Sequence, residues 1–359
     1  MVEPVAGVHY PRAEAELRSW FATDADCLDY LEWLRWPNGF VCARCEAADG
    51  WRLADGRFEC RVCGVRTSVT AGTIFDRTRT PLTVWFVACW LFVSRKNGVS
   101  ALGLQKTLGI GSYQTAWAML HRIRSALVRP ERERLSGRVE VDETLIGGHA
   151  EGDLGGRAMG EKVLVGIAVE MLSPKGLGRC RMSVIPNATG PVLRQFLVDN
   201  VVEGSTIVTD GFKSYWPATK GRYLHERHVA PGVTGPTVLP GSHRLASLVK
   251  RWLLGTHHAT MDEAHAQLYL NEFVFRFNRR RSRSRGLLLY RLLQCAVGHD
   301  PVRYRDLIAK RRPAQLDRKA PQPTRRQPPS LNQRAANRPW RQYLTNINMA
   351  QTPDQANSG

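Results

Sequence analysis

The chain has 359 residues, of which 43% are hydrophobic, so it is long enough for about two or three domains with buried cores. Its 51 Lys and Arg against 32 Asp and Glu give a net charge of +19 and a pI of about 10.1, which favours a polyanionic partner. The longest apolar run, residues 82–93, is shorter than the roughly 20 residues of a membrane helix, and the N-terminal sequence has no signal-peptide core, which argues against membrane and exported proteins.

These properties predict a soluble, cytoplasmic protein. Nucleic acid is the commonest polyanion that so basic a chain binds, and an anionic membrane surface is the alternative. In chain order, residues 1–39 are predicted to form one or two short helices, because apolar residues recur there at helical spacing.

Residues 40–76 contain two Cys-x-x-Cys pairs, Cys42 with Cys45 and Cys60 with Cys63, with fourteen residues between the pairs. Each pair brings two thiolates to one metal, and two such pairs complete a tetrahedral shell of four sulfurs that leaves no position for water. The spacing therefore predicts a zinc ribbon with a structural Zn²⁺. Two disulfides or free thiols are the alternative, which a reducing compartment disfavours.

Residues 80–130 are predicted to be helical. The apolar run at 82–93 is expected to be a buried core helix, and two further helical periods follow, with Ser112 able to cap the second. Two helices joined by a glycine-containing turn are typical of a helix-turn-helix, in which Tyr113, Gln114 and Arg122 would contact DNA. The same pattern also occurs in helical bundles that bind nothing.

From residue 136 the pattern changes to strands, then a helix near Pro191, another strand and later helices. This order predicts an α/β domain with a mixed sheet over residues 136–297. Its first strand, within the sequence EVDETLIGG, has three carboxylates, Glu140, Asp142 and Glu143. Because side chains alternate between the faces of a strand, Asp142 and Glu143 point in opposite directions, and one of the two faces any given site.

Asp210 follows the apolar strand STIVT and precedes Gly211. The carboxyl end of a buried strand is where α/β sheets place site residues, although Asp-Gly is also a common turn dipeptide. Together, Asp142 and Asp210 could hold divalent cations that a positively charged protein would otherwise repel. Such cations activate a water or a 3′-hydroxyl for attack on a phosphodiester.

With these motifs the sequence resembles bacterial insertion-sequence transposases of the DDE type, which have an N-terminal zinc ribbon and an RNase H-like catalytic domain. The resemblance covers about residues 22–296. It rests on the segments YLEWLRWPNGFVCARC, VEVDETLIGG, VTDGFKSYW, SLVKRWLLGTHH and YLNEFVFRFNRR. It implies an RNase H-like mixed sheet with flanking helices, in which Asp142 and Asp210 are the first two acidic residues and bind Mg²⁺ or Mn²⁺.

The third residue of that family pattern lies on a later helix, seven positions before a Lys or Arg. Here His243 stands seven before Lys250, so both side chains share one helix face and can reach the same phosphate, which would let Lys250 orient the DNA. Most DDE enzymes have Glu at this position, and imidazole is a poorer ligand than carboxylate for Mg²⁺. The chain nevertheless resembles a group in which Glu, Asn or His can occupy this position, and the matched spacing favours His243 as a metal ligand, with a general base or a DNA contact as the alternatives. Glu272, the nearest other acid, is expected to support the helix bearing Arg276.

The run FRFNRRRSRSRG, residues 275–286, is predicted to contact DNA phosphates rather than to form only a solvated surface. The arginines assigned to this role are Arg276, Arg279, Arg280 and Arg281. Residues 301–359 are basic, rich in proline and poor in large apolar residues, which predicts a disordered tail.

The resemblance implies a nucleoid-associated transposase that binds the terminal inverted repeats of its element as double-stranded DNA, cleaves them and joins the 3′-hydroxyls to target DNA. Since two ends are processed together, a homo-oligomer is expected. Two other functions remain open from the residues alone. One is a zinc-ribbon regulator that binds DNA without cutting it, and the other is a structure-specific nuclease with the same sheet.

Overall fold

A computed structural model describes residues 8–129, 132–147, 162–174, 176–228, 239–257 and 263–308. These residues divide into two compact units. The first unit combines residues 8–95, 101–129 and 283–308, and the second combines residues 96–100 with the described part of 132–282. Most of the tail predicted at 301–359 lies outside the described residues, but residues 304–308 form a short helix.

The first unit is mainly helical. Its helices are α1 (Glu14–Trp20), α2 (Asp24–Arg35), α3 (Leu82–Ser94), α4 (Ala101–Leu108), α5 (Tyr113–Ser125), α10 (Arg285–Gly298) and α11 (Tyr304–Ile308). The predicted core helix is confirmed, because α3 is buried along almost its whole length. Ser112 caps α5 as predicted, with its hydroxyl accepting a hydrogen bond from the Thr115 N–H at 3.1 Å. No described helix has both the length and the apolar character that spanning a membrane requires.

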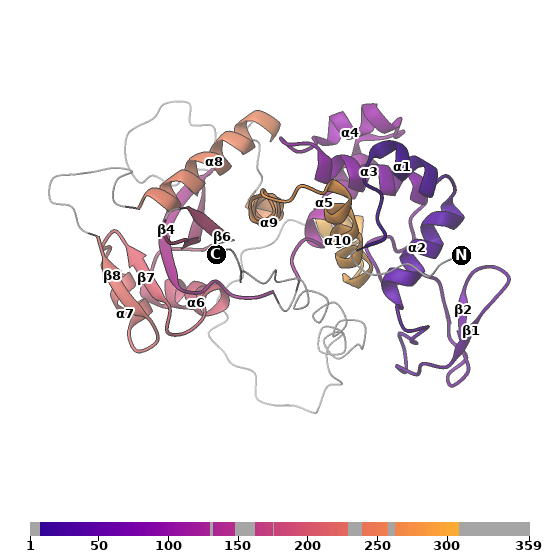
Figure 1. Ribbon diagram of the computed structural model, residues 1–359, viewed down its shortest axis with the longest axis horizontal. Helices are drawn as coiled ribbons and strands as arrows, with labels where there is room; N and C mark the ends of the chain where they lie inside the picture. The colour runs from indigo at the N-terminus through magenta and orange to yellow at the C-terminus, as the bar shows by residue number, and fades with distance from the viewer. Residues whose placement is uncertain are drawn as a thin grey trace, which may run out of the picture. The chain divides into compact units, whose positions relative to one another are not determined.

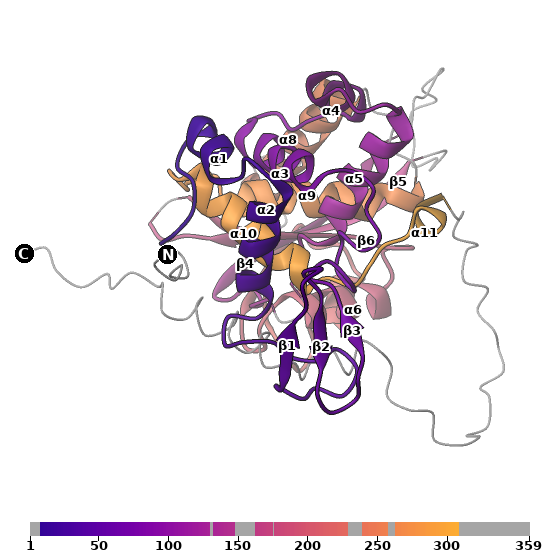
Figure 2. The ribbon, with the colours of Figure 1, turned by 90° about the vertical axis from the view of Figure 1, so that its right-hand side faces the viewer.

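A three-stranded antiparallel sheet lies within the first unit (Figure 2). Its strands are β1 (Gly50–Arg52), β2 (Phe58–Cys60) and β3 (Arg66–Thr67). The rings of Trp36, Phe40 and Phe58 pack together with centroids 5.0 Å apart. Gly50 makes this packing possible, since a Cβ at that position would lie 2.6 Å from the Phe40 ring.

The second unit contains a five-stranded mixed sheet (Figure 1). Its strands are β4 (Arg138–Ile146), β5 (Val163–Met171), β6 (Leu177–Val184), β7 (Thr206–Thr209) and β8 (Leu224–Arg227), in the order β6-β5-β4-β7-β8. Strands β4, β5 and β6 pair antiparallel, whereas β4, β7 and β8 pair parallel. The predicted RNase H-like mixed sheet is confirmed.

Helices cover both faces of this sheet. They are α6 (Gly190–Asn200), α7 (Tyr215–Thr219), α8 (Pro240–His257) and α9 (Ala266–Asn278), with a short 3-10 turn at Glu263–His265 before α9. On one face α8 and α9 pack against a core centred on Val165 and Ile167. On the other face α6 and α7 enclose Val139 and Val141. The strand that bears the carboxylates is therefore central and buried on both sides.

Helix α10 differs from the sequence prediction, which placed it in the catalytic domain at 136–297. It packs on α2 and α3 in the first unit instead. The Ile74 N–H donates to the Ala296 carbonyl at 3.4 Å, and the rings of Trp33 and Tyr290 lie 5.8 Å apart. The second unit therefore ends near residue 282, because the apolar face of α10 is buried by N-terminal helices.

Candidate functional site

The four paired cysteines converge at one end of the small sheet. All four Sγ atoms lie within 4.8 Å of one another, and the closest pairs are 3.5 Å apart. A disulfide requires about 2.05 Å, whereas a tetrahedral zinc with Zn–S bonds of about 2.3 Å separates its sulfurs by roughly 3.8 Å. The cluster fits a structural zinc ion and not a pair of disulfides.

Both cysteine pairs are shaped by the same turn. Glu46 and Gly64, which follow Cys45 and Cys63, have positive φ angles of 63° and 67°, and each N–H donates to the carbonyl of the first cysteine of its pair at 2.9 Å. The Cys63 N–H also lowers the pKa of the Cys60 thiol to about 7, which favours the thiolate that a metal binds.

The carboxylates of β4 alternate between the two faces of the sheet as predicted. Glu140 points toward α8, where its Oε2 accepts hydrogen bonds from the Gly241 and Ser242 N–H groups at 2.7 and 3.0 Å. Glu143 points toward α7 and accepts a hydrogen bond from the Tyr215 hydroxyl at 2.7 Å. Asp142 therefore shares the face of α8 with Glu140.

Asp142 and Asp210 come together because β4 and β7 pair in parallel. Glu140 lies opposite Val208, the last residue pair of this ladder, and Asp142 and Asp210 each follow two residues later. The two carboxylates are close enough for the charge of Asp210 to raise the pKa of Asp142. Gly211, with φ of 92°, turns the chain there, and Asp210 Oδ1 accepts the Phe212 N–H at 2.9 Å. Asp210 therefore forms the local turn, and it also lies at the exposed carboxyl end of a buried strand.

His243 reaches the same place from the first turn of α8. Its Nε2 lies 3.7 Å from Asp142 Oδ2, while the other oxygen of Asp142 accepts the Glu143 N–H at 2.9 Å. Because the buried Glu140 holds the N-terminus of α8, it fixes the position from which His243 projects. Glu140 is thus a positioning residue. The sequence placed it on the correct face but gave no sign that a helix would begin against it.

Burial raises the pKa of the Asp142 carboxyl above its ordinary value. The Glu143 N–H and His243 oppose this rise, and the negative charges of Asp210 and Glu140 add to it. Crowded carboxylates of this kind repel each other unless a cation lies between them, so the donor set fits a divalent ion bound by oxygen. The imidazole of His243 is a poorer ligand than a carboxylate for Mg²⁺, which prefers oxygen.

The three side chains do not form a compact ligand cluster. Within the described ranges, the four cysteines are the only group of three or more potential metal ligands whose donor atoms all lie within 4.8 Å. Asp142, Asp210 and His243 are therefore adjacent but more widely spaced than a closed metal shell.

Tyr215 is a site residue that the sequence analysis did not identify. Its ring is completely buried under the sheet, and its hydroxyl joins α7 to Glu143. Since Glu143 adjoins Asp142 and Tyr215 lies five residues after Asp210, this hydrogen bond ties the two aspartates' strands together at their ends. A tyrosine after a glycine turn offers no pattern from which this contact can be predicted.

The predicted phosphate contacts differ in their surroundings. Lys250 is exposed on α8. Arg276, by contrast, forms an ion pair at 2.8 Å with Glu272, which is fully buried, so the predicted support of this helix by Glu272 agrees with the structure. This pairing ties the Arg276 guanidinium to its own helix and argues against the predicted DNA contact.

Arg279 and Arg280 also have local partners. Their guanidinium groups lie 4.1 and 3.9 Å from the centres of the Phe275 and Phe277 rings. Arg280 further donates to carbonyl oxygens at the start of β6, and burial lowers its pKa. Arg281 is exposed, so it is the member of the predicted set best placed to reach a phosphate.

In the first unit, Tyr113 and Gln114 are exposed in the first turn of α5. Arg122 lies two turns further on and is half-buried. Most of α5 is buried, so only its beginning presents a surface of the kind that a recognition helix uses for base contacts.

Comparison with known proteins agrees with this arrangement. Residues 134–278 match a family model described as an ISXO2-like transposase domain, and residues 22–66 match one described as a transposase zinc-ribbon domain. A protein of Halobacterium salinarum, named as an uncharacterized protein in transposable element ISH50, is 26% identical over 274 residues, which are 71% of this chain and 91% of the relative. The two matched ranges contain the cysteine cluster and the whole five-stranded sheet. The chain therefore contains an ISXO2-like transposase domain, which is preceded by a transposase zinc-ribbon domain.

Proposed function

We propose that this chain is an active DNA transposase, which cleaves phosphodiesters at the ends of its own insertion sequence and joins the freed 3′-hydroxyls to target DNA. Asp142 and Asp210 act as the principal ligands of Mg²⁺ or Mn²⁺, and His243 completes the triad. The main support is the parallel register of β4 and β7, which brings Asp142 beside Asp210, together with the distance of 3.7 Å between His243 and Asp142.

When bound, a divalent ion supplies Lewis-acid activation of the attacking oxygen and charge stabilisation at the phosphate. The chain's own residues prepare that site. Asp142 directs one oxygen toward His243 while the backbone N–H of Glu143 holds the other. Glu140 fixes the start of α8, and Tyr215 fixes the end of β4 through Glu143.

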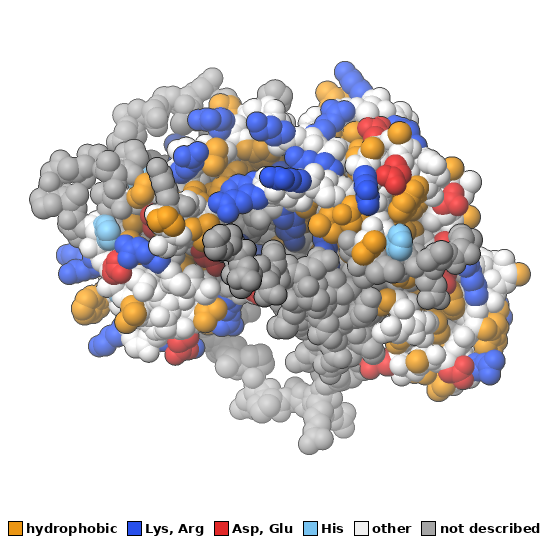
Figure 3. Space-filling view, in the orientation of Figure 1, with side chains coloured by type: hydrophobic (Ala, Val, Ile, Leu, Met, Phe, Trp, Pro, Cys, Tyr) orange, Lys and Arg blue, Asp and Glu red, His pale blue; other side chains and the backbone are white. Residues whose placement is uncertain are grey.

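The surface beside this triad suits a DNA backbone. Figure 3 shows Lys and Arg side chains gathered over α8, whose exposed residues include Arg244, Lys250 and Arg251 and no acid. Lys250 lies two helical turns from His243 on the same side, so it can contact a phosphate adjoining the cleaved bond. Arg281 adds a further exposed positive charge on this unit.

The test is strand cleavage of a labelled duplex that ends in the element's terminal repeat, with Mg²⁺ or Mn²⁺. Asp142→Asn and Asp210→Asn are each expected to lower the cleavage rate at least about 100-fold, since even outer-shell changes at metal sites cost 10–100-fold. DNA affinity should stay within a few-fold of wild type. Undiminished cleavage by Asp142→Asn would remove the catalytic assignment.

His243→Glu distinguishes the roles of the imidazole. If His243 is a metal ligand, the carboxylate should preserve cleavage and shift the preference from Mn²⁺ toward Mg²⁺. Complete loss in both metals would instead indicate a role that only imidazole can fill.

The same assay separates the other functions. A wild-type protein that binds the duplex but never nicks it would be a DNA-binding regulator. Cleavage of branched DNA without any joined product would indicate a structure-specific nuclease. Joined products should form only in a complex that contains two ends, so light scattering of the DNA-bound protein should show a homo-oligomer.

A further inference from the structure

A basic cavity in the first unit has no part in the site described above. It has a volume of about 350 Å³, which is within the range of small-ligand pockets. Its walls come from α3, α5, α11 and the turn at 77–80. A second cavity of about 310 Å³ adjoins it and shares the residues Arg77, Arg122 and Tyr304.

Positive side chains dominate the two cavities. Arg77, Arg79 and Arg122 line the first, and Arg303 and Arg305 line the second. Asp76 is the single acid among the lining residues of either cavity. Asp306, just outside, lies 3.7 Å from Arg305 and offsets part of that charge.

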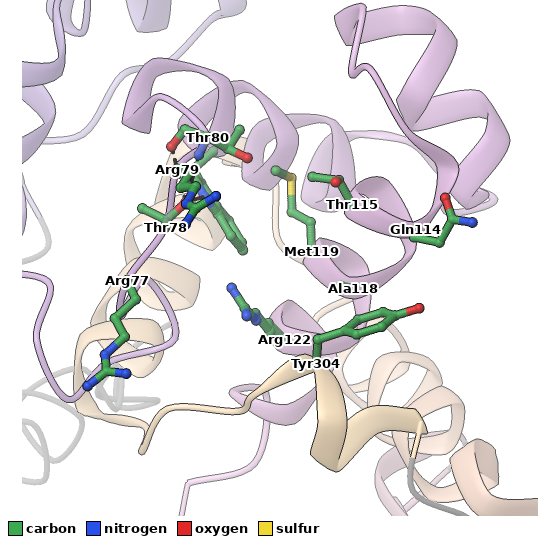
Figure 4. A pocket seen from close by; sticks show the side chains of 11 residues that line it. Arg77, Thr78, Arg79, Thr80, Gln114, Thr115, Ala118, Met119, Arg122 and Tyr304 are labelled. Carbon is green, nitrogen blue, oxygen red and sulfur yellow. Dashed lines mark hydrogen bonds between the residues drawn. The ribbon is translucent and has the colours of Figure 1, made fainter.

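Arg122 is the central cation. Figure 4 shows its guanidinium directed between the turn that bears Arg79 and the α5 residue Met119. Its Nε is buried and has no hydrogen-bond partner among the described residues. Burial lowers the pKa of Arg122, although the charge of Asp76 opposes this, and an arginine stays protonated regardless. A buried, unsatisfied donor on a cation is costly, and an anion in the cavity would satisfy it.

The rim of the cavity is already fixed. The Trp85 indole donates to the Thr78 hydroxyl at 2.9 Å, and that hydroxyl accepts the Thr80 N–H at 3.1 Å. Arg77 has a φ of 53°, an unfavourable left-handed conformation for a residue with a Cβ, and such strain is concentrated at functional sites. The hydrogen bonds of the Thr78 hydroxyl hold the backbone of the turn that bears Arg79 against α3.

We infer that these two adjoining cavities, here named the arginine pocket, bind a phosphate group of the DNA backbone, with Arg79 and Arg122 as its ligands and Arg77 as a further positive charge at the rim. This inference rests on the proposed DNA transposase function. The pocket is a positioning contact and not a base-reading one, because guanidinium groups that face a phosphate fix the register of a duplex without reading sequence. The exposed first turn of α5, with Tyr113 and Gln114, remains available to bases.

The test is the salt dependence of duplex binding by the full chain, measured by fluorescence anisotropy. The variants are Arg122→Met and Arg79→Gln, and the control is Arg18→Gln, which removes one exposed charge from α1 in the same unit. The logarithm of the DNA association constant falls linearly with the logarithm of the salt concentration. In each pocket variant this line should be less steep by about 0.9, the value for one lost phosphate contact, whereas the control should keep the wild-type slope.

A second measurement checks folding and the source of the anion. Inorganic phosphate should raise the melting temperature of the wild-type protein and have no such effect on Arg122→Met. The melting temperature of Arg122→Met without phosphate should not fall below that of wild type, because the substitution removes a buried donor that has no hydrogen-bond partner among the described residues. Arg79 is exposed, so Arg79→Gln folds normally and tests the pocket even if Arg122→Met is unstable.

The outcomes are distinct. Wild-type slopes in both pocket variants, with a wild-type protein that binds and cuts DNA, would overturn the pocket and leave the proposed function standing. Stabilisation by inorganic phosphate with unchanged DNA slopes would show a free-anion site and would also overturn it. A wild-type protein that neither binds nor cuts the duplex would instead contradict the transposase proposal itself.

Discussion

At the scale of single residues, removal of the Tyr215 hydroxyl is expected to lower both the stability of the protein and its cleavage rate. Burial raises the pKa of Tyr215 well above the ordinary value, as does the charge of Glu143, so the phenol stays protonated and donates to that carboxylate. Tyr215→Phe leaves Glu143 without this donor and should lower the free energy of unfolding by about 1–2 kcal/mol. Because the end of β4 loosens, cleavage should slow several-fold while DNA affinity is unchanged.

The matched control is Tyr223→Phe. Its hydroxyl donates to the Val201 carbonyl at 3.3 Å in the same unit, rather than to a residue of β4. Denaturant unfolding and cleavage kinetics of both variants separate the two roles. Equal loss of activity in Tyr223→Phe would show that lower stability alone explains the effect.

A second residue-scale prediction concerns pH. Burial by itself would raise the pKa of Glu170, but hydrogen bonds from Arg179 and from the Ser136 N–H outweigh it, and the pKa is lowered from 4.5. Since the folded pKa lies below the unfolded one, the stabilisation is present above about pH 4.5 and disappears as the pH falls through the folded value. Glu170→Gln should therefore cost about 1–3 kcal/mol at pH 7 and progressively less in acid.

Urea unfolding from pH 3 to pH 7 measures this difference. Glu203→Gln is the comparison, because Glu203 pairs with Arg222 at the surface and should change stability by less than about 1 kcal/mol at any pH. A cost for Glu170→Gln that does not vary with pH would contradict the assignment.

The orientation of a side chain could be predicted from the sequence where it depends only on neighbouring residues of the same strand. Strand alternation correctly placed Asp142 and Glu143 on opposite faces of the sheet. The arginines of residues 275–286 show the limit. Arg276 and Arg280 resemble phosphate ligands in sequence, but their partners, Glu272 and the start of β6, are apparent only once α9 is packed on the sheet.

At the scale of elements, the first turn of α8 depends on a glycine. A Cβ on Gly241 would lie 2.8 Å from Glu140 Oε2 and 2.9 Å from Met171 Sδ. Gly241→Ala should therefore displace the helix start and with it His243. We expect a stability loss of about 1–3 kcal/mol from overpacking and a fall in cleavage of about tenfold or more.

Gly255→Ala on the same helix is its control. No atom lies within 4 Å of a Cβ there, so alanine should stabilise the protein by up to about 1 kcal/mol and leave cleavage unchanged. Melting temperatures and cleavage rates of both variants test whether Gly241 positions the first turn of α8. Cleavage at the wild-type rate by Gly241→Ala would contradict this role.

The zinc ribbon gives a second element-scale prediction. Metal analysis should find one tightly bound zinc per chain, lost in Cys60→Ser but kept in Cys295→Ser, whose cysteine lies outside the cluster. Loss of zinc should expose the amides of β1–β3 to hydrogen exchange and leave those of β4 and β5 protected. Full zinc content in Cys60→Ser would contradict the four-sulfur site.

Elements defined by local signals were predicted well. The cysteine spacing predicted the zinc ribbon, and the change from helical to strand periodicity near residue 136 predicted the mixed sheet. The residues of α10 were assigned to the wrong unit, because an apolar helix can be covered by any apolar surface. Only the packing of Tyr290 and Ala296 against N-terminal residues settles its place.

At the scale of the whole molecule, the sheet unit interrupts the first unit. A truncated protein that ends at residue 282 keeps every element of the sheet unit but loses α10. The faces of α2 and α3 that α10 covers should then be exposed. Hydrogen exchange should show protected amides in β4 and β5 and rapid exchange in α2 and α3. In a protein truncated after residue 308, the amides of β4 and β5 and those of α2 and α3 should all be protected. Equal protection of α2 and α3 in the shorter protein would contradict their dependence on α10.

This dependence has a consequence during translation. Domains usually fold from the N-terminus as the ribosome releases them. Here the second unit has all its strands and helices before residue 283, whereas the first unit must wait for α10. The nascent chain therefore completes the sheet with Asp142 and Asp210 first and its zinc-ribbon unit last. A polypeptide released before α10 is synthesised would contain Asp142, Asp210 and His243 in a complete second unit, while its first unit would lack α10.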